Sequence, residues 1–498
     1  MNLEFDNLFT QELPCDSVGE NYVRQVNGAV FSRLDTARAP SPRVVSYSKE
    51  VGALIGLSAK DLESDEFREV FAGNQRLEGM DVHATCYGGH QFGNWAGQLG
   101  DGRAINLGEI VHQNNRFMLQ LKGAGPTPYS RSADGLAVLR SSLREYLCSE
   151  AMYHLGVPTT RALSLITSGS DVVRDMLYDG HPAAEPGAVV CRVSPSFIRF
   201  GHFQILTARN ELKLLRDLAD FTISTQFEHL KGLEDKERFS SWFDEVCQKT
   251  AHMIVHWMRV GFVHGVMNTD NFSILGETFD YGPYAFMESL NPEFICNTSD
   301  YEGRYRYSNQ PYIGLWNCSA LGEALKTLIP EAKIEEILKT YEQEFSSNLR
   351  KIYLDKLGLT EHQPGDDELI QDYLSLINNE NLDYTQSFRS LVKIIQEEDL
   401  IEGSGSLEKW KKRFLKRHEF EKSDLRDRLD MMKSINPYIT PKNFQIQKVI
   451  DAVEKGNYEA LHSFCDAFKN PFEENSKTQV FDEVPGENEA NIRTSCSS

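Results

Sequence analysis

Several features that would assign a chain to a membrane-bound, secreted or nucleic-acid-binding class are missing from this sequence. No window approaches 18 uncharged apolar residues, so we expect no segment that spans a membrane. The N-terminus, MNLEFDNLFTQELPCDSVGE, has neither a basic region followed by an apolar run nor an Arg-rich amphipathic pattern. We therefore predict a cytoplasmic protein.

Paired cysteines and an excess of positive charge are also missing. The nine cysteines are scattered, odd in number and without a CxxC pair, which is typical of reduced thiols in a cytosolic protein. The 52 Lys+Arg residues face 73 Asp+Glu residues, which gives a formal net charge of −21. This balance argues against a surface built for nucleic acid or anionic lipid, so neither is an expected partner.

What is present is the composition of an ordinary globular protein, with 40% hydrophobic and 25% charged residues over 498 positions. Glycine is so dense between residues 86 and 103 that we predict a loop there. Apolar spacing predicts short strands over 104–108, 117–122 and 189–193, a helix over 136–155 and further helices over 212–260. We predict a break over 403–406 and five regions: 1–80, 81–205, 206–345, a helical 346–470, and an acidic tail over 471–498.

The most informative stretch is HGVMNTDNFSILGETFDYG, which begins at His264. It follows the catalytic and metal-binding pattern of protein kinases, H-R-D-L-x-x-x-N and then D-F-G. Asn271 matches the metal-holding Asn, and Asp280 begins the D-F-G equivalent, so both are candidate ligands of Mg²⁺ or Mn²⁺. Val266 stands where the catalytic base belongs. Asp270 is therefore the candidate proton acceptor, although Asn-Thr-Asp-Asn can also form a simple polar turn.

Upstream residues suit phosphate binding. Gly100 and Gly102 allow backbone N–H groups to approach phosphate oxygens, and Arg103 adds a bidentate clamp. Lys122 ends an alternating strand, and Glu145 follows 23 residues later on the predicted helix, as the strand lysine and helix glutamate of kinases do. The alternative for the glycine motif is an ordinary turn, and for Lys122 a solvated residue at a strand edge.

Two further pairs are candidate nucleotide ligands. Asp134 and Gly135 lie between Lys122 and Glu145, where a helix N-cap is the alternative interpretation. Arg192 and Arg199 stand seven residues apart around a proline turn and can bind phosphates, or can be surface cations paired with nearby acids.

These segments together resemble one family. The chain is similar to the selenoprotein O family, also called the YdiU family, over at least residues 30–320. The matching motifs are YGGHQFGNWAGQLGDGR, LKGAGPTPYSR, RVSPSFIRFGHF and GFVHGVMNTDNFSILGETFDYGPYAF. The resemblance implies an α+β, protein-kinase-like two-lobe fold with an N-terminal extension and a helical C-terminal elaboration. It also implies ATP bound in a flipped orientation, with AMP transferred to Ser, Thr or Tyr hydroxyls of proteins, or UMP from UTP.

The resemblance assigns roles residue by residue. Asp270 corresponds to the proton acceptor, Asn271 and Asp280 to the metal ligands, and Glu145 to the partner of Lys122. The nucleotide ligands are the residues named above together with Asp280: Gly100, Gly102, Arg103, Lys122, Asp134, Gly135, Arg192 and Arg199. Cysteine at the third position from the end is a further family mark, and a redox disulfide between Cys296 and Cys496 is the hypothesis it raises. A free thiol on a tail is the alternative.

Three functions stay open on the sequence. The preferred one is a metal-dependent protein nucleotidyltransferase. The second is a conventional phosphotransferase with Asp270 as a displaced base, and the third is a non-catalytic nucleotide-binding switch.

Overall fold

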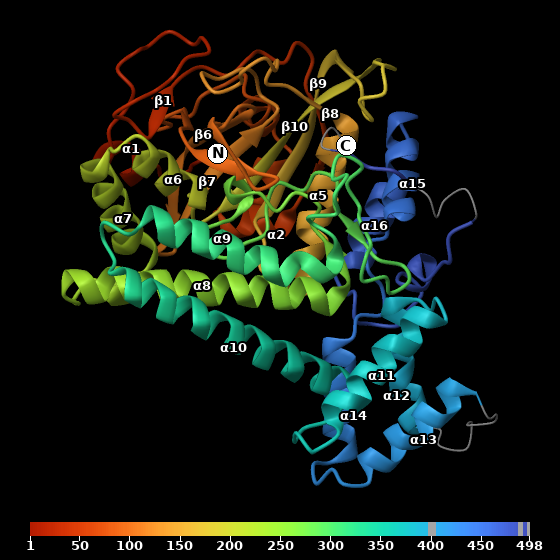
Figure 1. The fold of residues 1–498 in the computed structure, drawn as a ribbon. Coiled ribbons are helices and arrows are strands. Elements are labelled where there is room, and N and C mark those ends of the chain that lie inside the picture. The colour runs from red at the N-terminus through yellow and green to blue at the C-terminus, as the bar shows by residue number, and fades with distance from the viewer. Residues whose placement is uncertain (397–404, 487–491, 496–498) are drawn as a thin grey trace.

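The computed structural model describes residues 1–396, 405–486 and 492–495 (Figure 1). Its centre is an eight-stranded antiparallel sheet in the order β1-β3-β6-β7-β10-β9-β2, with β8 paired to β10. The strands are β1 (Phe31–Arg33), β2 (Arg43–Tyr47), β3 (His83–Thr85), β6 (Ala104–His112), β7 (Asn115–Lys122), β8 (Ala137–Val138), β9 (Arg161–Arg174) and β10 (Ala183–Ser194).

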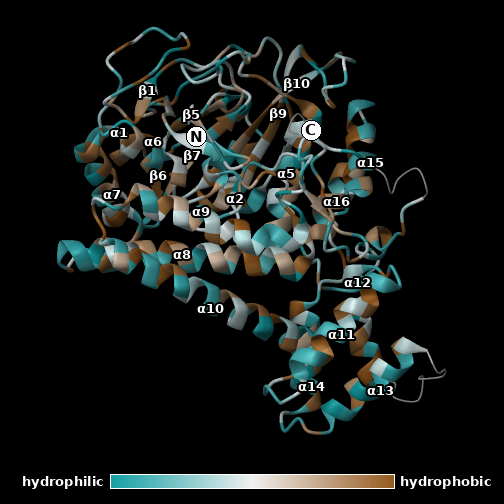
Figure 2. Ribbon diagram, in the orientation of Figure 1, coloured by the Kyte–Doolittle hydropathy of each residue, from teal (hydrophilic) through white to brown (hydrophobic). Residues whose placement is uncertain are grey.

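Alternation along β7 and β10 sends side chains into two different hydrophobic cores. Leu119 and Leu121 of β7 enter the core against the N-terminal helices, whereas Met118 enters the core shared with the later helices. Figure 2 colours β9 and β10 largely hydrophobic where they cross the sheet, as strands buried on both faces must be. Gln120 and Lys122 therefore lie on the Met118 face, toward the helices.

The helices divide by position along the chain (Figure 1). Short helices lie before β3 in the chain: α1 (Leu8–Glu12), α2 (Lys49–Leu54), α3 (Ala59–Leu62) and α4 (Asp65–Phe71). One helix, α5 (Leu139–His154), packs on β9 and β10. The next group is α6 (Phe200–Ala208), α7 (Leu212–Gln226), α8 (Asp235–Val260), α9 (Gln310–Ala324) and α10 (Glu331–Lys356).

The C-terminal helices form two groups. Those at the lower edge of Figure 1 are α11 (Asp366–Asn379), α12 (Tyr384–Gln396), α13 (Ser406–His418) and α14 (Leu425–Ile435). The last two, α15 (Asn443–Glu454) and α16 (Glu459–Phe468), return to pack against α5. Of the predicted break over 403–406, residues 403 and 404 lie outside the described residues.

The long helix α8 carries the chain to the candidate catalytic loop. Its apolar side chains recur at helical spacing and are buried, and it ends at Gly261, whose φ of 71° is the left-handed conformation that stops helices. A two-strand ladder follows at once, between β11 (Phe262–Val263) and β12 (Ala285–Phe286). The residues between these strands contain the motif that begins at His264.

The sequence interpretation needs two corrections. The glycine-rich segment over 86–103 is not wholly irregular, because it contains a hairpin of β4 (Gly88–Gln91) and β5 (Asn94–Gln98). Its two strands are short and form a ladder only with each other, so residue propensities gave little indication of them. In addition, β9 was not predicted. Its buried residues include Ser164, which breaks the apolar pattern, and the ladder to β10 pairs Ser164 with Cys191.

Candidate active site

A cavity of about 680 Å³ gathers the predicted site residues. It is bounded by the ends of β6, β7 and β10 on one side and by the loop after β11 on the other. Its lining includes every predicted nucleotide and metal ligand and the candidate proton acceptor: Gly100, Gly102, Arg103, Lys122, Asp134, Gly135, Arg192, Arg199, Asp270, Asn271 and Asp280.

The predicted ion pair between strand and helix is present. Lys122 Nζ lies 2.5 Å from Glu145 Oε2, and the Glu145 side chain is 3% exposed. Register explains how a second cation joins them, because Arg192 of β10 is directly opposite Gln120 of β7 and so shares the face of Lys122. Arg192 Nη1 lies 2.9 Å from Glu145 Oε1. The edge-residue interpretation of Lys122 and the surface interpretation of Arg192 are therefore wrong.

Asp280 is the centre of the charge cluster. Its carboxylate lies 3.2 Å from Lys122 Nζ, 2.6 Å from Arg192 Nη1 and 2.8 Å from Arg199 Nη1. Burial alone would raise the pKa of Asp280, but the three cations outweigh it and hold that pKa well below its usual range. Asp280 also has a φ of 58°, an uncommon conformation for a non-glycine residue. The Asp280 carboxylate is thus surrounded by positive charge, and the same charge would attract the phosphate groups of a bound nucleotide.

Asp270 lies at the opposite side of the cavity from the sheet. It belongs to the short 3-10 helix η2 (Thr269–Asn271), and its backbone carbonyl accepts a hydrogen bond of 2.7 Å from Arg199 Nη1. Burial raises the pKa of its carboxyl group to about 6, and Arg199 partly opposes that rise. Oδ1 has no hydrogen-bond partner among the described residues. An unpaired carboxylate oxygen of this kind can accept a proton from a hydroxyl group.

The glycine turns have specific geometric reasons. Gly100 has a φ of 80°, and the neighbouring Asp101 is fixed by hydrogen bonds to its carboxylate from Thr85 N at 2.9 Å and Thr85 Oγ1 at 2.6 Å. A Cβ on Gly135 would lie 2.2 Å from Gly125 O, so only glycine fits there. At both turns, backbone atoms rather than a side chain therefore face the cavity.

Asp134 lies at the exposed rim of the cavity. Its carboxylate pairs with Arg174 at 2.7 Å and accepts a hydrogen bond of 3.0 Å from Leu136 N. Helix α5 begins at Leu139 with Val138 as its N-cap residue, so the N-cap interpretation of Asp134 is wrong.

The donor atoms suit a hard divalent cation. Asn271 offers an amide oxygen while its Nδ2 donates to Val266 O at 2.9 Å, and Asp280 offers two carboxylate oxygens. Mg²⁺ usually takes few protein oxygens and completes its shell with water and phosphate. Within the described ranges, no group of three or more His, Cys, Asp or Glu side chains could hold a metal. A metal at Asn271 and Asp280 would therefore depend on the nucleotide for further ligands.

The comparisons with known proteins agree on one family. The family model described as "Protein adenylyltransferase SelO" matches residues 16–469. The chain belongs to the SelO family. Among curated relatives, the protein nucleotidyltransferase YdiU of Azoarcus sp. (strain BH72) is 46% identical over 496 residues, covering 96% of this chain and 95% of the relative.

Two other relatives carry the same description. The protein nucleotidyltransferase YdiU of Rhodopirellula baltica is 46% identical over 521 residues, 97% of this SelO-family chain and 96% of the relative. The protein nucleotidyltransferase YdiU of Flavobacterium johnsoniae is 46% identical over 498 residues, which cover 96% of this chain and 95% of the relative. The resemblance inferred from the motifs is thus confirmed over nearly the whole length.

Sequence reasoning missed the side chains that attach the hairpin to the catalytic loop of this SelO-family chain. His90 N donates to Thr269 Oγ1 at 2.7 Å, and Phe92 N donates to Asn268 Oδ1 at 3.2 Å. Gln91 Nε2 lies 3.4 Å from Asp270 Oδ2, and a Cβ on Gly89 would lie 2.6 Å from Asp270 Oδ1. The one sequence feature that could have indicated these contacts is the polar run Asn268-Thr269-Asp270, whose three side chains all face the hairpin.

The chain's final described residues reach the loop that follows Asp280. Thr494 O accepts a hydrogen bond of 2.8 Å from Thr298 N, and Thr494 Oγ1 donates to Cys296 O at 2.6 Å. Ser495 Oγ donates to Met176 O in the connection between β9 and β10. Cys296 is buried, and Cys496 lies outside the described residues, so the predicted disulfide stays a prediction.

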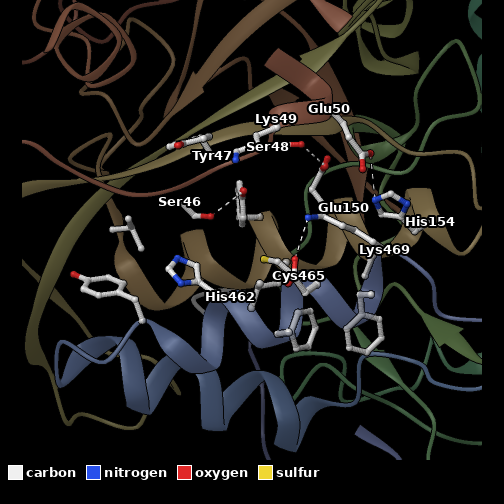
Figure 3. Close-up of a pocket in the computed structure, with 18 of the residues that line it drawn as sticks. Ser46, Tyr47, Ser48, Lys49, Glu50, Glu150, His154, His462, Cys465 and Lys469 are labelled. Carbon is white, nitrogen blue, oxygen red and sulfur yellow. Dashed lines mark hydrogen bonds and ion pairs between the residues drawn. The ribbon is translucent and has the colours of Figure 1, made fainter. Parts of the chain in front are cut away.

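A second cavity, of about 810 Å³, lies behind α5 (Figure 3). Its walls are β2 and the start of α2, the outer face of α5, and α16 with Cys465 and Lys469. Glu150 of α5 is already engaged, because it accepts hydrogen bonds from Ser48 Oγ at 2.9 Å and from Arg161 Nε at 2.8 Å. Ser48 thus connects the N-terminal part of the chain to the helix that carries Glu145, and the packing of α16 on α5 connects the C-terminal part to it.

None of the described helices of this SelO-family chain is both long and apolar enough to cross a bilayer.

Proposed function

We propose that this protein is a protein adenylyltransferase that transfers AMP from ATP to Ser, Thr or Tyr hydroxyls of other proteins, with UTP as a second donor. One observation carries the proposal: Lys122, Arg192 and Arg199 converge on a single carboxylate at the buried end of a cavity that Asp270 also lines. The descriptions of the family and of its curated relatives as nucleotidyltransferases support it.

The architecture behind the proposal is a protein-kinase-like fold with two lobes. The antiparallel sheet with α5 would form the first lobe, and α6 to α10 with the loop after β11 the second. The order of these elements supports this, as does the ion pair between Lys122 and Glu145, which has the strand and helix origins of the kinase pair.

In the proposed reaction, the acceptor hydroxyl attacks the α-phosphorus of ATP. Asp270 accepts the hydroxyl proton, a bond forms between the hydroxyl oxygen and the α-phosphorus, and the bond between the α-phosphorus and the bridging oxygen to the β-phosphate breaks. Pyrophosphate leaves with that electron pair, stabilised by Lys122, Arg192 and Arg199. These cations lie deep in the cavity, which suits a triphosphate whose terminal phosphates point inward.

Asn271 and Asp280 would hold the divalent cation, which when bound neutralises phosphate charge. Both Mg²⁺ and Mn²⁺ accept this oxygen donor set. Lys122, Arg192 and Arg199, which contact the Asp280 carboxylate, would then stabilise the phosphates from the same positions. Val266 offers no proton acceptor, so the position of Asp270 in η2 fixes where the acceptor hydroxyl must lie.

The test uses ATP labelled separately at the α- and γ-phosphates, with the purified full chain, Mg²⁺ or Mn²⁺, and candidate protein acceptors including the chain itself. Label retained on protein from the α-phosphate alone is the expected result. Retention from the γ-phosphate alone would replace the proposal with a conventional phosphotransferase. Tight binding of nucleotide with neither label retained would leave a non-catalytic nucleotide-binding protein.

A redox disulfide between Cys296 and Cys496 is a second part of the proposal. The contact that supports the pairing is made by Thr494, which precedes Cys496 by two residues in the sequence and donates its hydroxyl to the backbone carbonyl of Cys296. Oxidation would fix the loop after Asp280 to the C-terminus and so restrict access to the cavity. Peptide mapping of oxidised protein under non-reducing conditions should find the two cysteines joined, and their consistent absence as a pair would end the idea.

A further inference from the structure

An unpaired cation lies beside the mouth of the candidate active site. Arg304 is partly buried, and no carboxylate of the described residues lies within ion-pair distance of its guanidinium. Its Nε is buried without a hydrogen-bond partner. The nearest acid in sequence, Asp300, uses its oxygens to accept the backbone N–H groups of Arg304 at 2.9 Å and Tyr305 at 2.7 Å. No carboxylate among the described residues therefore neutralises the Arg304 guanidinium, which lies partly buried beside the cavity.

Aromatic side chains and the hairpin tip frame this arginine. Its guanidinium carbon lies 4.8 Å from the ring centroid of Trp316 on α9, and a Cβ on Gly93 would lie 3.0 Å from the same carbon. Trp95 of the hairpin is 40% exposed and is connected to Trp316 through His90, whose ring centroid lies 5.1 Å from that of Trp95 and 5.4 Å from that of Trp316. Tyr312, one helical turn before Trp316, is 59% exposed. We call Trp95, Arg304, Tyr312 and Trp316 the Arg304 patch. Arginine, tryptophan and tyrosine are the residues that contribute most to protein recognition sites.

The patch is connected to Asp270 by short structural links. Gln91 and Phe92 line the nucleotide cavity, and Gly93, against which Arg304 packs, is the next residue. Tyr305, adjacent to Arg304, donates its hydroxyl to Asn268 Oδ1 at 2.7 Å, two residues before Asp270. The Arg304 patch therefore begins where the cavity that contains Asp270 ends.

We propose that the Arg304 patch binds an acidic side chain of the acceptor protein close to the hydroxyl that is modified. The inference rests on the proposed function, because it names the kind of acceptor segment that this site takes. An arginine held on an aromatic face forms charge-assisted hydrogen bonds to a carboxylate more strongly than a freely solvated cation does. A single cation matches one carboxylate, whereas a nucleic acid would need many.

Geometry sets the spacing within the acceptor. A Cβ on Gly89 would lie 2.6 Å from Asp270 Oδ1 and one on Gly93 would lie 3.0 Å from the Arg304 guanidinium carbon, and these two glycines are four residues apart. An extended peptide advances about 3.3 Å per residue, so a carboxylate at the patch would lie within about four residues of the hydroxyl at Asp270. The patch thus acts on acceptor selection and contributes no atom to the transfer step.

The experiment measures peptide binding and AMP transfer separately, with the full chain. Fluorescently labelled peptides carry one Ser, Thr or Tyr and, within about four residues of it, a glutamate, a glutamine or a lysine. Anisotropy titrations should show the glutamate peptide binding to the unmodified protein about tenfold more tightly than the glutamine peptide. In Arg304→Gln that preference should disappear, in Arg304→Lys most of it should remain, and in Arg304→Glu the lysine peptide should bind best.

The matched control is Arg306→Gln. Arg306 is two residues away and already pairs with Glu293 at 3.0 Å, so its loss should leave the preference unchanged. Equal binding of glutamate and glutamine peptides by the unmodified protein would overturn the proposal, as would a preference that survives in Arg304→Gln. Transfer from α-labelled ATP to the same peptides tests the proposed function on its own. If no AMP is transferred but the glutamate peptide still binds more tightly than the glutamine peptide, the proposed activity is contradicted and the proposed binding role of the Arg304 patch stands.

Discussion

At the scale of single residues, Asp280 decides the electrostatics of the cavity. Three cations contact the Asp280 carboxylate, and two of them, Lys122 and Arg192, also form ion pairs with Glu145. The cations are therefore held in position before any phosphate arrives, and little rearrangement is needed when it does. The same residue is a candidate metal ligand, so its removal should affect both charge and metal.

We predict that Asp280→Ala lowers AMP transfer by at least about 100-fold, because a positioned charge of this kind contributes that much to catalysis. Retention of α-labelled phosphate on protein measures the effect. Glu185→Ala is the matched control, since it breaks the ion pair of 2.8 Å between Glu185 of β10 and Arg140 of α5, and neither residue lines the cavity. Full transfer activity in Asp280→Ala would remove the metal assignment.

Gly89 is a second residue-scale determinant, because the space beyond its Cα is filled by the Asp270 carboxylate. We expect Gly89→Ala to displace Asp270 and lower kcat by about tenfold to 100-fold, while nucleotide affinity changes little, since Gly89 does not line the cavity. Steady-state kinetics with a nucleotide-binding titration separates the two effects. Gly232→Ala, where a Cβ meets nothing within 4 Å, is the control. An unchanged kcat in Gly89→Ala would mean that Asp270 tolerates displacement.

At the scale of elements, Glu277 joins β10 to the loop between Asn271 and Asp280. Ser194 Oγ donates to Glu277 Oε2 at 2.6 Å. Burial raises the pKa of Glu277 to about 7, a rise that this hydrogen bond and Lys249 partly oppose. The folded state therefore binds a proton that the unfolded chain releases near its ordinary value of 4.5, and the contribution of Glu277 to stability falls as pH rises from about 4.5 to about 7.

We predict that Glu277→Gln, which keeps an acceptor for Ser194, is more stable than the unmodified protein at pH 8 by about 1 to 2 kcal/mol after discounting for solvent screening. At pH 4.5 the two should be nearly equal. Denaturant unfolding at both pH values measures the difference, with the exposed Glu380→Gln as control. A stability difference that does not depend on pH would show that Glu277 ionises normally.

How far the sequence predicts the structure also differs by element. Lys122, Glu145 and Arg192 were predictable, because strand alternation and helical spacing place such residues on definite faces. The hairpin of β4 and β5 and its attachment to Asn268 and Thr269 were not. Those bonds join residues more than 170 positions apart and depend on side chains meeting backbone N–H groups, for which no periodic pattern exists. The unpaired state of Arg304 was equally invisible, since the absence of a partner is a property of the fold.

At the scale of the whole molecule, both ends of the chain are integrated. β1 and β2, from the predicted N-terminal extension, complete the sheet, and α15 and α16 pack on α5. Thr494 forms a bridge to Asn297 in the loop after Asp280. The tail thus contacts the region through which an acceptor protein would approach.

We predict that a chain ending at Gly486 exchanges the Thr298 amide hydrogen much faster than the full chain, because that N–H bonds to Thr494 O. Hydrogen exchange followed by mass spectrometry measures this. The Asp300 amide, which bonds to Asn297 O at 3.0 Å within the same loop, is the internal control and should stay protected. Equal exchange of Thr298 in both chains would mean that the tail contact does not persist in solution.

The hydrogen bonds from the hairpin to η2 restrict the routes by which ligands can enter and leave the cavity. His90 and Phe92 donate backbone hydrogens to Thr269 and Asn268, so the strand pair cannot lift away without breaking several contacts at once. If the proposed function holds, a nucleotide would therefore enter and leave along the other rim, past the exposed turn that carries Asp134. On the two proposals together, the nucleotide would reach the cavity past Asp134, whereas the acceptor protein would dock on the hairpin side, beside Arg304.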